Sequence, residues 1–186
     1  IHLWDGEKPE RALVSAANCG QSSPGIAHMW HMPGHIYSKL KRYQDAAWQQ
    51  EASARVDHAH MIKDRILPDQ IHNFAHNNEW LIRNLNFLGR INDAVGLAKN
   101  MIELPHHPNI NTLAKPDSPT EYGKRGSARY GRTRLIETLL RYEMWEEIIQ
   151  LSQTVYLSDT MIPEEQAKRL AAIGVAHYSL GQADKG

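Results

Sequence analysis

The chain has 186 residues, of which 41% are hydrophobic and 23% are charged, a balance typical of a globular domain with a core of its own. Its 21 basic and 21 acidic residues cancel, which argues against general binding to nucleic acid or to an anionic membrane. The single cysteine, Cys19, excludes an internal disulfide and a cysteine-based zinc site, and no apolar run has the roughly 18 residues that a membrane helix needs.

The predicted elements are helices, joined by a turn motif that recurs along the chain. In its best copies the motif is Leu-Gly, followed by an aromatic or apolar residue and then by a small Ala, as in 88–94. Weaker copies occur at 40–46 and 142–148, and 180–183 opens another. The Gly allows the left-handed conformation that ends a helix, an acidic residue favours the start of the next one, and the Ala lets the two helices approach closely.

These turns divide the chain into a series of predicted helical hairpins. In chain order we expect half a hairpin, three full hairpins and a final half hairpin, with an extra stretch from 58 to 73. Because both half hairpins are incomplete, we expect the chain to be a piece of a larger array, whose open end would also allow a homodimer. The predicted boundaries are 1–24 for the trailing half repeat, 25–58, 73–105 and 127–163 for the repeats, 106–126 for a loop insert, and 164–186 for the leading half repeat.

The residues around the turns resemble the tetratricopeptide repeat (TPR). In that family the first helix of each hairpin carries a large residue, then Leu-Gly, then Tyr, and the second helix carries a small Ala. The turns here are spaced more widely than the family's repeat of about 34 residues. The resemblance implies an all-α fold, a right-handed superhelical solenoid of antiparallel helix hairpins with a concave groove. In the first full hairpin the matching residues are Trp30, Gly34, Tyr37 and Ala46, whereas Pro33 stands where Leu is usual.

Histidines gather on one face of two predicted helices. Positions 28, 31 and 35 are three and four residues apart, as are 72, 76, 79 and 83, and such spacing places side chains on one helix face. The resemblance implies that this face lines the concave groove. The predicted partner-binding groove consists of His28, His31, His35, Lys39, His72, His76, Glu79, Arg83, Asn86, Tyr130, Glu137 and Arg141.

The same histidines allow a metal site as an alternative. Two histidines four residues apart on a helix can chelate zinc or copper, and a nearby carboxylate could complete the set. Pro33 and Gly34 lie between the first such pair and are expected to distort their helix. The candidate zinc ligands are His31, His35, His72, His76 and Glu79.

The function expected from these features is a protein- or peptide-binding scaffold module of a larger protein, without catalytic residues or a cofactor. Its partner would be a protein or peptide rather than nucleic acid or a membrane, and a cytoplasmic location fits the single thiol. We expect the histidine-rich groove to favour acidic groups when protonated and to lose that preference at about pH 6 to 7. Two alternatives stay open: a metal-binding helical domain or metal-dependent enzyme that uses the histidines, and a structural linker within a multidomain enzyme.

Overall fold

The computed structural model describes all residues except 3–4, 108–125, 183 and 185–186, so most of the predicted loop insert lies outside it. Every regular element in the described part is helical, which confirms the predicted all-helical class for those residues. The α-helices are α1 (Leu13–Ser22), α2 (Ala27–Lys39), α3 (Tyr43–Asp64), α4 (His72–Phe87), α5 (Ile91–Glu103), α7 (Ser127–Arg141), α8 (Trp145–Leu151) and α9 (Pro163–Ser179). The short 3-10 helices are η2 (Pro9–Ala12), η3 (Pro68–Gln70) and η4 (Val155–Leu157). None of the helices described has the combination of length and hydrophobicity needed to cross a lipid bilayer.

Four residues with left-handed backbone angles lie at the predicted turns. Lys41, Gly89, Glu143 and Gly181 have φ values of 58, 70, 55 and 72°. In each turn the following residue donates its backbone N–H to the carbonyl five residues earlier, at 2.9 to 3.0 Å, which ends the helix. The first three turns join α2 to α3, α4 to α5 and α7 to α8, and the two helices of each pair pack against each other.

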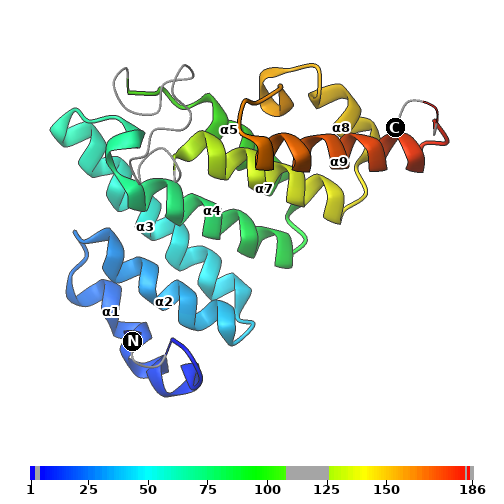
Figure 1. Cartoon of the computed structure of the whole chain (residues 1–186). Coiled ribbons are helices and arrows are strands. Elements are labelled where there is room, and N and C mark those ends of the chain that lie inside the picture. The colour runs from blue at the N-terminus through cyan, green and yellow to red at the C-terminus, as the bar shows by residue number, and fades with distance from the viewer. Residues whose placement is uncertain (3–4, 108–125, 183, 185–186) are drawn as a thin grey trace.

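Small and aliphatic side chains hold successive helices together. Ala46 and Ala94, each near the start of the second helix of a pair, are fully buried, as the turn motif predicts. The main core lies between α4, α5, α7 and α8, where Ile82, Leu135 and Ile148 are fully buried. In addition α2 contacts α4, and α4 contacts α7, so the first helices of the three pairs are neighbours (Figure 1). This arrangement brings the histidines of α2 close to those of α4.

The helix α3 is longer than the repeat predicted from the sequence. It continues past residue 58 to Asp64, and Arg65 then adopts a left-handed conformation (φ 55°) that ends it. The added turns are anchored by Met61, which is buried in one cluster with Phe74 of α4. Part of the extra stretch predicted between the first two hairpins is therefore helix.

The helix α2 is continuous across Pro33 and Gly34, from Ala27 to Lys39. A proline inside a helix removes one backbone hydrogen bond. Both residues are buried, and α2 packs along α3, so tertiary contacts compensate for the missing bond. The expected distortion therefore does not break this helix or separate its two central histidines.

Candidate functional site

The predicted groove residues lie on α2, α4 and α7, and several of their rings form a continuous series of contacts. The ring centroids of His28 and His31 on α2 are 5.8 Å apart, and His31 is 4.8 Å from His76 on α4. His76 in turn lies 5.5 Å from His72 and 6.3 Å from Tyr130 on α7. A surface of imidazole and phenol rings, which we call the ring wall, therefore spans three helices.

Some of the predicted groove residues are buried beneath this surface. His31, Glu79 and Asn86 are only 2%, 5% and 7% exposed. The side-chain amide of Asn86 donates from Nδ2 to Thr138 Oγ1 at 2.9 Å, which joins α4 to α7. The prediction that these three side chains are exposed to a partner is therefore wrong, because all three are buried and pack between the helices that carry the ring wall.

Two arginines form a charged end of the same face. Arg83 and Arg141 are exposed, and their guanidinium carbons lie 4.7 Å from the ring centroids of Trp80 and Phe87, respectively. A guanidinium above an aromatic face is attracted by the ring and keeps its N–H edges free for other acceptors. In the part of the chain that the structure describes, neither arginine has an ion-pair partner.

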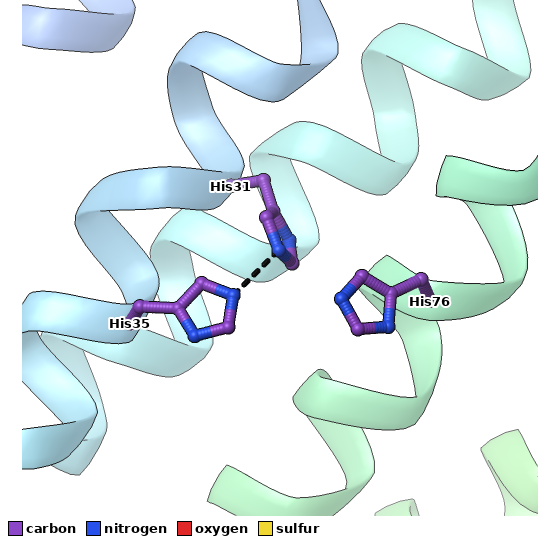
Figure 2. Close-up of side chains that lie close together, drawn as sticks. All are labelled: His31, His35 and His76. Carbon is purple, nitrogen blue, oxygen red and sulfur yellow. Dashed lines mark hydrogen bonds between the residues drawn. The ribbon is translucent and has the colours of Figure 1, made fainter. Parts of the chain in front are cut away.

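Three histidines converge at the centre of the ring wall. His31 and His35 of α2 and His76 of α4 each offer one ring nitrogen, and these nitrogens all lie within 4.8 Å of one another. The Nε2 atoms of His31 and His35 are 2.7 Å apart. Figure 2 shows the three rings facing a common space. Helical spacing brings the first two rings together, whereas only the packing of α2 beside α4 adds the third.

Gln50 of α3 determines which nitrogen of His31 carries the proton. Its Nε2 donates to the backbone carbonyl of His31 at 3.3 Å, so its Oε1 faces His31 Nδ1, 2.8 Å away. Because this oxygen accepts, Nδ1 is the protonated nitrogen and Nε2 keeps its lone pair on the side of His35. Gln50 can approach this closely because Gly34 has no side chain, and a Cβ there would lie 2.3 Å from Gln50 Nε2.

His76 is supported by a buried carboxylate. Its Nδ1 lies 3.2 Å from Glu79 Oε1, within ion-pair range although not aligned as a hydrogen bond. Figure 2 shows the other ring nitrogen of His76 facing His31 and His35. Glu79 is held in turn by Arg134 of α7, whose Nε donates to Oε2 at 2.7 Å. Burial tends to raise the pKa of Glu79, but its contacts with His76 and Arg134 lower it overall, so Glu79 is a carboxylate at neutral pH.

Two of the three central imidazoles, those of His31 and His35, are neutral at physiological pH. Burial, assisted by the neighbouring His35, lowers the pKa of His31 to about 3. Burial also lowers the pKa of His35 to about 4, although the Asp5 carboxylate acts in the opposite direction. The expected loss of charge at about pH 6 to 7 is therefore wrong for these two rings, because they are already neutral there.

We expect the metal-free protein to lose stability as the pH falls from about 6.5 toward 4. Unfolded His31 takes up a proton near its ordinary pKa of 6.5, whereas the folded pKa is about 3. The stability that its neutral form contributes is complete above this range and falls by about 3 kcal/mol by pH 4. Asp57 opposes the change, since burial raises its folded pKa from 3.8 to about 6. Urea unfolding in chelator at a series of pH values measures the result.

Two variants separate these opposing contributions. His31→Gln should flatten the fall in unfolding free energy on acidification, because it removes the imidazole that resists protonation. Asp57→Asn should steepen the fall, because it removes a carboxyl that is stabilised by protonation in the folded state. His35, whose folded pKa is about 4, loses stability over the same range as His31, so Asp57 offsets only one of the two losses. A wild-type protein whose stability stays constant from about pH 6.5 to 4 would therefore contradict the lowered pKa values of His31 and His35.

The predicted zinc ligands are brought together only in part. His31, His35 and His76 form one group, whereas His72 stacks against His76 without joining the group. Glu79 contacts Nδ1 of His76. The other ring nitrogen of His76 is the one that faces His31 and His35 in Figure 2. The structure therefore reduces the candidate ligand set to three imidazoles and gives Glu79 a supporting position.

Two residues of the site were missed by sequence reasoning. Gln50 and Arg134 come from α3 and α7, and the spacing rule used for the prediction relates only residues of one helix. For Gln50 the one available signal was Gly34, because a glycine inside a predicted helix often marks a close approach. For Arg134 the sequence offered no signal that would have paired it with Glu79.

No family model, curated protein or solved structure gives a significant match to this chain.

Proposed function

We propose that the chain is a protein- or peptide-binding module of TPR type, which holds its partner on the face formed by α2, α4 and α7. The observation that carries this proposal is the ring wall, in which ring contacts run from His28 through the buried His31 to His76 and Tyr130. A surface that joins three helices from separate hairpins can recognise an extended segment, because each helix contributes its own contacts.

The repeated turns support the TPR-like part of the proposal. Lys41, Gly89 and Glu143 share one backbone geometry and one hydrogen-bond pattern, so each reverses the chain in the same manner. Three reversals of the same kind favour a solenoid in which the first helix of every pair lies on the same side. In a right-handed superhelix of this type, that side would be the concave one and would include the ring wall.

The charged end of the face favours an acidic partner. A cavity of about 360 Å³ is lined by Arg83, Arg141 and neighbouring residues. The other charged groove residues, Lys39, Glu79 and Glu137, are already in ion pairs. Among the described residues neither arginine has an ion-pair partner, so both can bind an acceptor on a partner. Guanidinium groups bind carboxylates in a bidentate manner, so an acidic side chain or a terminal carboxylate suits this end of the groove.

The test is loss of partner binding when both arginines are removed. Immobilised wild-type protein and the Arg83→Ser/Arg141→Ser variant would be compared for capture of proteins from a cell lysate, quantified by mass spectrometry. We expect proteins retained by the wild type to fall about tenfold or more on the variant, because two charge-assisted contacts are lost. The two arginines lie outside the three-histidine group, so this result is independent of any metal bound there.

A charge-matched variant controls for non-specific attraction. Arg55→Ser/Lys63→Ser removes two exposed basic residues from α3 and leaves the ring wall unchanged. It should retain the same proteins as the wild type. Equal losses from both double variants would refute binding at the α2, α4 and α7 face and would indicate simple charge attraction.

A further inference from the structure

We propose that His31, His35 and His76 together bind one Zn²⁺ ion through three imidazole nitrogens, with a fourth position for water. The donor set fits this ion, because zinc prefers nitrogen ligands in tetrahedral geometry and often keeps one position open when the protein supplies three. The three donor atoms already lie within 4.8 Å of one another. This inference goes beyond partner binding and does not depend on it.

The groups that contact these histidines from behind are arranged as they are in a metal site. Histidines that bind a metal usually donate the other ring N–H to an oxygen acceptor, which sets their tautomer and orientation. His31 does so through Nδ1–H to Gln50 Oε1, at 2.8 Å. His76 presents Nδ1 to Glu79 Oε1, at 3.2 Å, and a small ring rotation would align that bond. Two of the three ligands are therefore already oriented with Nε2 toward the shared space.

Binding requires the rings to adjust, because the three donor nitrogens lie up to 4.8 Å apart and must move closer together. In a tetrahedral site with Zn–N distances of about 2.0–2.1 Å, the nitrogens lie about 3.3 Å apart. The present separation of 2.7 Å between His31 Nε2 and His35 Nε2 is slightly shorter, and it is explained by a hydrogen bond in which His35 donates. His35 would change tautomer, so that its single N–H moves from Nε2 to Nδ1 and the Nε2 lone pair binds the zinc ion.

The surroundings favour a cation and give it a path of entry. His31 is 2% exposed and forms the floor, whereas His35 and His76 are partly exposed and leave the site open toward the ring wall. The Glu79 carboxylate directly behind His76 would partly offset the charge of the ion. Because Arg134 holds Glu79 from the other side, the carboxylate is kept behind His76 and away from the shared space.

The experiment is calorimetric titration of ZnCl₂ into protein that carries no affinity tag and has been treated with chelator. We expect one ion per chain for the wild type. His35→Ala and His76→Ala should each weaken binding by at least about 100-fold, because each removes one ligand from a partly exposed position. Gln50→Leu should weaken it by about 10- to 100-fold, since Gln50 is a positioning residue that sets the His31 tautomer. Co²⁺ in place of Zn²⁺ should give the visible absorption of a tetrahedral site in the wild type only.

A matched histidine on the same helix provides the control. His72→Ala removes a ring that stacks on His76 at 5.5 Å but lies outside the group, and it should leave zinc affinity within about threefold of the wild type. Circular dichroism of each chelator-treated variant confirms that it is folded. Absence of zinc binding by the wild type, binding that is unaffected by His35→Ala and His76→Ala, or an equal loss in His72→Ala would each overturn the proposal.

Discussion

Replacing Arg134 by methionine is expected to lower the free energy of unfolding by about 3 kcal/mol. Arg134 binds Glu79 through Nε at 2.7 Å, and the two side chains are only 19% and 6% exposed. Methionine fills a similar volume but leaves the Glu79 carboxylate buried without its guanidinium partner. Removing one member of a buried ion pair is costly because the remaining charge is no longer compensated. Urea unfolding at neutral pH measures the difference.

The double variant Glu79→Gln/Arg134→Met tests this explanation. Without the negative charge the penalty for an unpaired carboxylate disappears, so the double variant should be more stable than Arg134→Met alone. Arg55→Met is the control, because Arg55 pairs with Glu51 on the exposed face of α3 and its side chain is 78% exposed. Its effect should stay within about 0.5 kcal/mol. If the double variant is no more stable than the single one, the buried charge is not the cause.

Replacing Gly131 by valine is expected to lower the free energy of unfolding by a similar amount, about 3 kcal/mol. Gly131 lies where α7 crosses α5, and a Cβ at this position would be 2.7 Å from the carbonyl oxygen of Ala98 and 2.9 Å from Met101 Cβ. A backbone oxygen cannot move aside without shifting its helix, so the two helices would have to separate. Their separation would open the main core, in which Met101 is fully buried.

Gly96 offers a matched control within the same pair of helices. It lies in α5, and a Cβ there would meet nothing within 4 Å. Gly96→Val should therefore change the free energy of unfolding by less than about 0.5 kcal/mol, since only the helix propensities of the two residues differ. Chemical denaturation of both variants measures the two changes in the free energy of unfolding. Equal changes at positions 96 and 131 would show that close packing of α5 on α7 is not the reason for glycine at position 131.

The candidate site combines features that sequence spacing could reveal with others that it could not. The spacing of His31 and His35 predicts that they share a helix face, and they do lie side by side despite the proline between them. The prediction of Glu79 as a ligand went beyond what spacing can show. Spacing places Glu79 and His76 on one helix face but does not show which nitrogen of His76 the carboxylate contacts. Partner binding by this face is a prediction that the arginine variants test. Membership of the repeats in the TPR family also stays a prediction.

The local features of this protein could be predicted from its residues alone: the all-helical class, the positions of the turns at Lys41, Gly89 and Glu143, and the helix faces that carry histidine. These features follow from backbone preferences and from the helical period, which depend on residues only a few positions apart. Two further features, the approach of His76 to the α2 histidines and the orientation of His31 by Gln50, became visible only in the packed helices. Contacts between separate helices depend on the fit of all the side chains along their interface, and no local pattern encodes that fit.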